Sequence, residues 1–167
     1  DKSLRIEGSE IINDNAYATG YQTERSFTIR RHYHVSCPAN TWTSIISFRP
    51  YIAGTTDDPG ASTLWAGVSY KMEISGHQNG VGNGYRSRTG MVSYEGSSAA
   101  NDYASDVVMG NTNGAISARV NKSGWVATLE VNPDSPSTGG FSGSVYVEIN
   151  FGRGAGSNGQ NIVWSIT

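Results

Sequence analysis

Residues 63–76 read TLWAGVSYKMEISG, and this stretch decides the fold. Apolar side chains occupy every second position from Leu64 to Ile74, and small or polar residues fill most of the positions between them. A β-strand produces a period of two because its successive side chains point to opposite faces, whereas on a helix the same residues would spread around the whole cylinder. The stretch therefore predicts a long central strand with one face buried and the other mixed and mostly in contact with water.

The same alternation recurs along the chain between clusters of turn-forming residues. In 26–36, SFTIRRHYHVS, one face carries Phe27, Ile29, Tyr33 and Val35 together with Arg31. Other alternating stretches lie at 115–121, 125–131, 144–151 and 161–167, and in 4–12 Leu4 and Ile6 alternate before Gly8 interrupts the pattern. We expect an all-β fold, an antiparallel β-sandwich of about eight to ten strands with a jelly-roll-like arrangement.

Three segments depart from regular alternation. The strand pattern at 42–52 contains Pro50, and we expect the strand to break there because proline cannot donate a backbone hydrogen bond. Residues 97–109 favour a short helix, with Ser98 or Asn101 as its N-cap. Residues 76–90, GHQNGVGNGYRSRTG, contain five glycines and predict a long mobile loop.

Length and composition limit the organisation. A chain of 167 residues suffices for one domain that buries about two thirds of its unfolded surface, so we expect 1–167 to form a single domain. Charged residues make up 16% of the chain and glycine contributes 21 residues, a mixture that favours strands and polar turns over helices. Cys37 is the single cysteine, which excludes an intramolecular disulfide and predicts a small buried side chain.

Charge and hydropathy exclude several classes of partner. With 12 basic and 14 acidic residues the net charge is −2, which is not the signature of a nucleic-acid-binding protein. No apolar run reaches membrane-spanning length, and no secretory signal opens the chain. The chain begins at Asp1 and its last strand pattern reaches Thr167, so we expect the C-terminal part of a longer fibrous protein.

Motifs for catalysis fail on their context. Residues 154–159 match G-x-G-x-x-G, but a strand pattern follows where a dinucleotide-binding motif needs a helix. Ser142 and Ser144 lie among glycines without the spacing of a nucleophile elbow. No spacing selects a pair of carboxylates for glycoside cleavage. The sequence therefore predicts no catalytic residue, no cofactor and no enzymatic activity.

His32 and His34 lie two residues apart, so on a strand they share one face and could share one metal ion. The pair resembles the first half of the cupin metal motif, but 35–40 lacks the carboxylate that should follow. In a trimeric viral spike such a pair could meet its symmetry copies around an axial ion. We interpret both histidines as residues of the polar face, beside Arg30 and Thr28, and predict no metal site.

The candidate ligand-binding residues lie in the predicted loop at 76–90. Aromatic faces stack on sugar rings, and Arg and Asn side chains form planar hydrogen bonds to hydroxyls or carboxylates. Loops on a rigid sandwich commonly carry binding residues. The alternative is a flexible hairpin whose polar residues only contact solvent. The predicted binding residues are His77, Asn79, Tyr85, Arg86 and Arg88.

The chain as a whole resembles the C-terminal receptor-binding head or knob domain of a tailed-bacteriophage tail fibre, tailspike or tail needle. The resemblance lies in low-charge strands rich in Ser, Thr, Asn and Gly, the single cysteine, the start at Asp1, and the closing strands GSVYVEINF (143–151) and NIVWSIT (161–167) around a glycine loop. It implies a homotrimeric, jelly-roll-like domain in the virion tail. Such domains recognise a bacterial surface polysaccharide or outer-membrane receptor through their distal loops.

We therefore expect non-enzymatic host cell-surface recognition, without nucleic acid and without membrane insertion. The alternative is a carbohydrate-binding module or lectin-like domain appended to an enzyme and working as a monomer. A cupin-type metalloenzyme using His32 and His34 and a purely structural role in a tail are the remaining alternatives.

Overall fold

The structure is a computed structural model, and it describes residues 4–6, 9–13, 27–52, 64–78, 82–95, 98–110, 116–133, 140–156 and 162–167. Within these ranges every regular element is a strand, which confirms the predicted all-β class. The strands are β1 (Leu4–Ile6), β2 (Ser9–Asn13), β3 (Phe27–Cys37), β4 (Thr43–Ile52), β5 (Leu64–Gln78), β6 (Gly82–Glu95), β7 (Ser98–Gly110), β8 (Ile116–Ser123), β9 (Val126–Pro133), β10 (Phe141–Gly156) and β11 (Ile162–Ile166).

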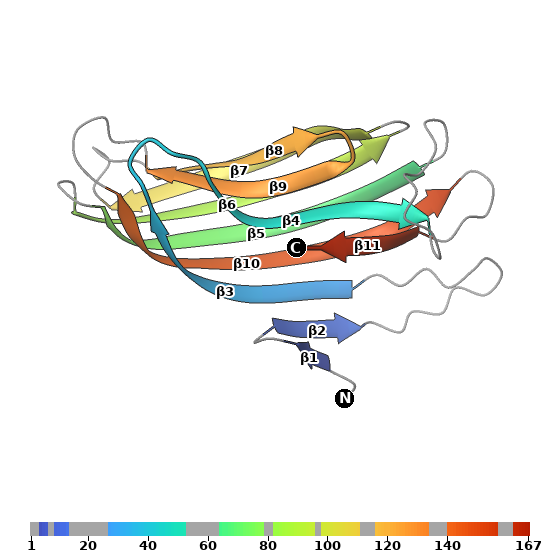
Figure 1. The fold of residues 1–167 in the computed structure, drawn as a ribbon, viewed down its shortest axis with the longest axis horizontal. Coiled ribbons are helices and arrows are strands. Elements are labelled where there is room, and N and C mark those ends of the chain that lie inside the picture. Colours follow the sequence, from blue (N-terminus) through green and yellow to red (C-terminus); the bar gives the residue numbers. More distant parts are fainter. Residues whose placement is uncertain are drawn as a thin grey trace.

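The strands form two sheets packed face to face (Figure 1). The larger sheet has seven strands in the order β1-β2-β3-β10-β5-β6-β7, and the smaller has four in the order β11-β4-β9-β8. All neighbours are antiparallel. Strands far apart in the chain pair with one another, as when β10 lies between β3 and β5. Greek-key and jelly-roll sandwiches share this connectivity.

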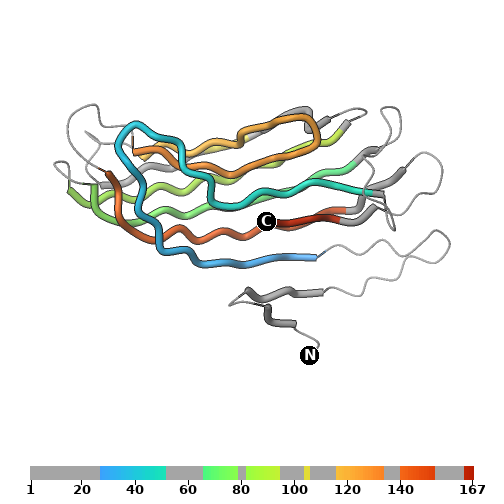
Figure 2. Tube along the Cα trace, viewed as in Figure 1, coloured from blue at the N-terminus to red at the C-terminus, as the bar shows by residue number. Residues whose placement is uncertain are grey.

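The chain crosses repeatedly between the two sheets. Figure 2 shows it leaving the end of β3, turning through residues 38–42 and returning as β4 in the second sheet. The backbone N–H of Asn40 donates to the carbonyl of Pro133 at 3.2 Å, which ties this turn to the end of β9. In Figure 1, β1 and β2 extend the large sheet past the edge of the small one.

The alternating residues of β5 form the centre of the core. Val68, Tyr70, Met72 and Ile74 are each exposed by 1% or less. They belong to one cluster with buried residues of the opposite sheet, such as Leu129. β5 lies between β10 and β6, so the predicted interior strand is confirmed. β3 also follows the prediction, since Ile29 is buried on its inner face.

The segment predicted as a mobile loop, 76–90, is mostly paired strand. β5 continues to Gln78 and β6 begins at Gly82, so only residues 79–81 lie between them. β6 has a full antiparallel partner on each side, β5 and β7. These two ladders satisfy its backbone groups from Gly84 onward, so Gly84 and Gly90 are held in paired strand despite the weak strand preference of glycine. The loop prediction was wrong.

The helix prediction at 97–109 was also wrong, because β7 occupies Ser98–Gly110. Its strand pairs with β6 along almost its whole length, with one register shift. A ladder with a neighbouring strand outweighs a weak local helix preference, especially in a segment that also contains Tyr103, Val107 and Val108.

Pro50 does not break its strand, which was predicted to end there. β4 runs through Thr43–Ile52, and Pro50 is opposite Trp164 of β11. Ser47 exchanges backbone hydrogen bonds with Thr167 on the β11 side, so Pro50, three residues on, directs its nitrogen towards β9. The register with β9 reaches only Phe48, and the missing donor therefore costs no ladder hydrogen bond.

Cys37 is buried, as predicted, and is 1% exposed at the end of β3. None of the described residues belongs to a helix long and apolar enough to cross a membrane.

At Gly76 the neighbouring backbone of β10 and the ring of Phe141 leave no room for a side chain. Gly76 pairs with Gly143 of β10 on one side and with Gly84 of β6 on the other. A methyl group on Gly76 would lie 2.5 Å from the carbonyl oxygen of Ser142 and 2.7 Å from the ring of Phe141. The buried Phe141 ring thus packs directly over two glycines.

We predict that Gly76→Ala lowers the free energy of unfolding by about 1–3 kcal/mol or more, as overpacking in a core does. The matched control is Gly84→Ala, at the paired position of β6. There the added methyl would meet only Ile116 Cδ1, at 3.9 Å. Thermal or denaturant unfolding measures both variants, and equal stability of the two would contradict this account of the packing.

Candidate functional site

The outer face of the seven-stranded sheet is the candidate functional site. The small sheet covers the inner face, so every second residue of β3, β10, β5 and β6 points away from the core. On β10 the outward residues lie between buried Val145, Val147 and Ile149. We call this surface the outer face; its central residues are Arg30, His32, Lys71, Glu73, Tyr85, Tyr146 and Glu148.

The strand register sets most of these residues in rows that cross three strands, β3, β10 and β5. One row places His32 of β3 opposite Tyr146 of β10, and Tyr146 opposite Glu73 of β5. The next row places Arg30 opposite Glu148, and Glu148 opposite Lys71. Side chains directly opposite each other on neighbouring strands have Cβ atoms about 5 Å apart, so residues of one row are in contact range.

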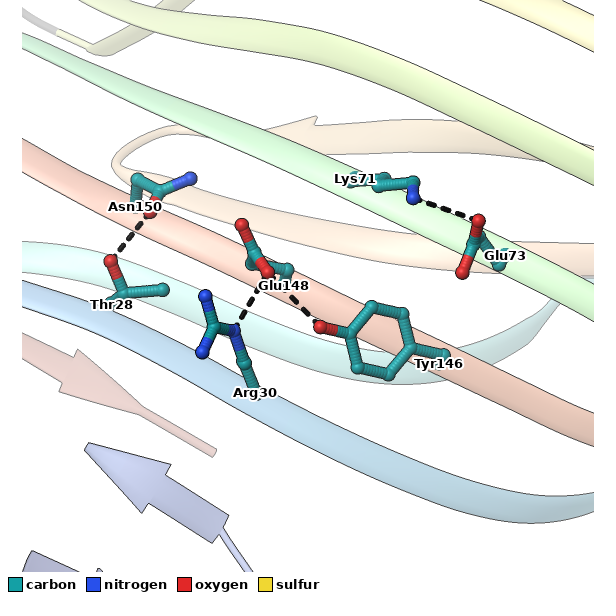
Figure 3. A network of polar contacts seen from close by, with 7 residues as sticks. All are labelled: Thr28, Arg30, Lys71, Glu73, Tyr146, Glu148 and Asn150. Carbon is teal, nitrogen blue, oxygen red and sulfur yellow. Dashed lines mark hydrogen bonds and ion pairs between the residues drawn. The ribbon is translucent and has the colours of Figure 1, made fainter. Parts of the chain in front are cut away.

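Two ion pairs neutralise the charges of this face (Figure 3). The Arg30 Nε atom donates to Glu148 Oε2 at 2.8 Å, across β3 and β10. The Lys71 Nζ atom lies 2.8 Å from Glu73 Oε1, along β5. The side chains are 26–45% exposed, so the pairs are accessible to a ligand and contribute little to stability.

Two tyrosine rings are held against the sheet by their hydroxyl groups. Tyr146 donates to Glu148 Oε2 at 3.0 Å, two residues along its own strand (Figure 3). Tyr85 donates to Glu73 Oε1 at 3.0 Å on the neighbouring strand. These bonds direct both tyrosine side chains towards neighbouring residues of the same face. Both rings are half-buried, which leaves part of each available to a flat ligand.

His32 extends the aromatic surface onto β3. Its ring centroid lies 4.7 Å from that of Tyr146, at an interplanar angle of 46°. Tyr85, Glu73, Tyr146 and His32 therefore form a band across β6, β5, β10 and β3, which we call the aromatic band. At about 4.8 Å between strands the band spans roughly 14 Å.

The same contacts shift the ionisation of these groups. The hydrogen bond from Lys71 lowers the pKa of Glu73, and that from Arg30 lowers the pKa of Glu148. Glu73 in turn raises the pKa of Lys71. Partial burial, followed by the bond to Glu148, raises the pKa of Tyr146. Both carboxylates therefore stay ionised, and the tyrosine neutral, around neutral pH.

The structure separates the residues predicted as one binding loop. His77 and Tyr85 lie on the outer face, where His77 Nδ1 is 3.2 Å from Asn83 Oδ1. Arg86 and Arg88 lie on the inner face, because β6 places them on the same side as buried Val92. Asn79 lies outside the described residues.

The two arginines make contacts within the sandwich. Arg86 Nη1 donates to the carbonyl of Ile116 on β8 at 2.7 Å, and Arg88 Nε donates to the hydroxyl of Tyr70 at 3.0 Å. Adjacent residues of a strand face opposite ways, so Tyr85 and Arg86 cannot contact one flat ligand together. Whether any of the predicted residues binds a ligand stays a prediction.

His32 and His34 both lie exposed on the outer face of β3, as predicted. In the described part of the chain no three His, Cys, Asp or Glu side chains come together in a way that could hold a metal ion.

Sequence reasoning did not select Tyr146, Glu148, Arg30 or Lys71 as site residues. The alternation in 144–151 already placed Tyr146 and Glu148 on the solvent side of a strand. A tyrosine among the polar residues of the solvent side was the feature that could have marked this strand as part of a site. Their neighbours could not be identified, because Arg30 and Glu148 are 118 positions apart in the chain.

A second polar cluster lies on the outer face of the small sheet, and its contacts are internal. Arg119 lies over the ring of Trp42, 3.9 Å from its centroid, and donates to Glu130 Oε2 at 2.8 Å. Asn121 donates to Glu130 Oε1 at 3.2 Å. Glu130 is only 6% exposed, so this cluster offers a ligand less than the aromatic band does.

We predict that the Arg30–Glu148 pair makes stability depend on pH. The pKa of Glu148 in the folded protein is below its usual 4.5, so the pair stabilises the fold above that pH and the contribution is lost as pH falls. Glu148→Gln should be less stable than wild type at neutral pH, by up to about 1 kcal/mol, and the difference should shrink as the pH falls below 4.5.

Thermal melts across pH measure this difference. Ser144→Ala changes an exposed residue of the same strand and face, and its difference from wild type should not depend on pH. A Glu148→Gln difference that widens on acidification would contradict the proposed linkage.

Comparison with known proteins gives one structural similarity. No protein-family model and no curated protein matches the sequence. Among solved structures, the chain is similar to the Acinetobacter baumannii phage AM24 tailspike protein, with a TM-score of 0.35 and 8% sequence identity. The match covers 83% of this chain and 28% of the tailspike chain, so the chain spans less than a third of that protein's length.

Proposed function

We propose that this protein is a non-enzymatic recognition domain that binds a cell-surface glycan through the outer face of its seven-stranded sheet. The observation that carries the proposal is the aromatic band, in which Tyr85, Tyr146 and His32 lie along one sheet surface. The hydroxyl groups of two of these rings are tied to carboxylates of the same face. Ring faces that lie along a surface suit the apolar faces of sugar rings.

The polar groups around the band suit sugar hydroxyls. Arg30, Lys71, Glu73 and Glu148 place donors and acceptors beside the rings, and all four side chains remain partly exposed. A sheet surface also holds them more rigidly than a loop would, which lowers the entropy lost on binding. The contact surface therefore differs from the distal loops that the sequence suggested.

The ionised state of the Glu73 and Glu148 carboxylates supports a role without catalysis. A glycoside hydrolase needs one carboxylic acid with a raised pKa to protonate the leaving group. Glu73 and Glu148 have lowered pKa values and both accept hydrogen bonds from cations. Neither is suited to donate a proton at neutral pH.

For the biological setting we propose the tip of a phage tail fibre or spike, with the domain acting as a homotrimer in the virion tail. This part of the proposal follows the sequence resemblance. The bound group would be a bacterial surface polysaccharide or another outer-membrane receptor.

We predict that Tyr146→Ala and Tyr85→Ala each weaken binding to host cells or to a glycan array by about tenfold. Contacts between aromatic rings contribute about 0.5–1.5 kcal/mol beyond the burial of their area, and about 1.4 kcal/mol corresponds to a factor of ten in affinity. Binding to cells, followed by flow cytometry, and array fluorescence measure the effect.

The matched control is Tyr51→Ala, which removes a half-buried tyrosine from the outer side of the small sheet, where Arg49 lies 4.2 Å from its ring centroid. Binding by this variant should equal that of wild type. Unchanged binding by both outer-face variants, or no binding by wild type, would refute the proposed surface.

We predict a trimer in solution by size-exclusion chromatography with light scattering. A monomer that still binds glycan would instead favour a carbohydrate-binding module appended to an enzyme. The measurement needs the wild-type chain at several concentrations, because a weak trimer dissociates on dilution.

A further inference from the structure

We infer that the glycan on the outer face is uncharged and lies extended across the strands, from β6 to β3. This inference rests on the proposed function, because it specifies the ligand of the same surface. It follows from three features of the aromatic band and its surroundings: its charge balance, its remaining hydrogen-bonding capacity and its direction.

The charges of the described outer-face residues around the band cancel locally. Arg30 is paired with Glu148 and Lys71 with Glu73, both at 2.8 Å. Each cation therefore already has a carboxylate beside it. An acidic sugar that approached Lys71 or Arg30 would also approach Glu73 or Glu148, and the repulsion would offset the attraction. A cationic sugar that approached Glu73 or Glu148 would likewise be repelled by the neighbouring Lys71 or Arg30.

The positive and negative charges around the band stay balanced over a wide pH range. The pKa of each carboxylate is lowered and the pKa of Lys71 is raised. All four groups therefore stay charged between weakly acidic and weakly basic pH. The surface presents paired charges to any ligand under those conditions.

Hydroxyl groups suit the hydrogen-bonding capacity that the pairs leave. Lys71 and Tyr85 both bind Oε1 of Glu73, and Arg30 and Tyr146 both bind Oε2 of Glu148. A carboxylate has about four acceptor sites and an ammonium three donors, so acceptors and donors remain side by side. A hydroxyl both donates and accepts, whereas a carboxylate only accepts.

The direction of the ligand follows from the band itself. Its aromatic members come from β6, β10 and β3, so the rings succeed one another across the strands rather than along one of them. Glu73 of β5 lies between Tyr85 and Tyr146 and binds the hydroxyl of Tyr85. A ligand that contacts all three rings must extend over roughly 14 Å.

The test is a set of acidic bacterial surface polysaccharides, each presented beside its carboxyl-reduced form, together with neutral polysaccharides. We expect wild type to bind neutral and carboxyl-reduced forms at least as tightly as the parent acidic forms, because the attraction of an acidic sugar to Lys71 or Arg30 is offset by its repulsion from Glu73 or Glu148. Affinity for a neutral ligand should change less than about twofold when salt is raised across the range over which surface charges become screened.

A charge variant sharpens the test. Glu148→Gln removes one negative charge from the outer face and should improve binding to acidic forms relative to their reduced forms by about fivefold. Tyr51→Ala, on the opposite sheet, should leave the ratio unchanged. Oligosaccharides too short to reach from Tyr85 to His32 should lose the effect of His32→Ala but keep that of Tyr146→Ala.

The outcomes separate the two proposals. Preference of wild type for acidic forms, with binding lost in Tyr146→Ala, would overturn the uncharged ligand and keep the recognition surface. No binding to any polysaccharide would overturn both. A change of oligomeric state in Tyr146→Ala or Tyr85→Ala would also overturn both, because the face would then be an interface between copies of the chain.

Discussion

The register of β10 between β3 and β5 is the constraint on which the rest of the structure depends. From Phe141 to Phe151 each residue of β10 has a partner on both neighbours. Because the side-chain period is two, this register fixes which residues enter the core and which face outward. A slip of one residue would bring Glu148 into the core and expose Ile149. Burial of the apolar residues therefore also builds the polar rows of the outer face.

The outer face is thus a consequence of packing on the other side of the same strands. The side chains of Val147 and Ile149 are exposed by 1% or less, and Glu148 between them is directed to Arg30. The ion pairs need no separate element to hold them, and at their exposure they contribute little to stability. Under the proposed function, their arrangement on a rigid sheet serves recognition.

The sequence allowed the faces of single strands to be predicted, but not their neighbours. The inner residues of β5 and β3 follow directly from alternation, because a period of two survives any choice of partner. The pairs Arg30–Glu148 and Tyr85–Glu73 depend on strand order, which local patterns do not contain. The glycines at 76–90 suggested a loop, and a loop would have let Tyr85 and Arg86 act together. Once β5 and β7 pair with β6, these neighbours must face opposite ways.

A recognition surface on paired strands has consequences for affinity. The aromatic band is formed before the ligand arrives, so little conformational entropy is lost, but a flat, solvent-exposed surface also buries little of a ligand. One copy should then bind weakly and dissociate quickly. Three copies on one fibre would convert later contacts into intramolecular ones, and several weak sites would give firm attachment. The proposed trimer and the shallow band therefore fit together, since a host surface repeats its polysaccharide many times.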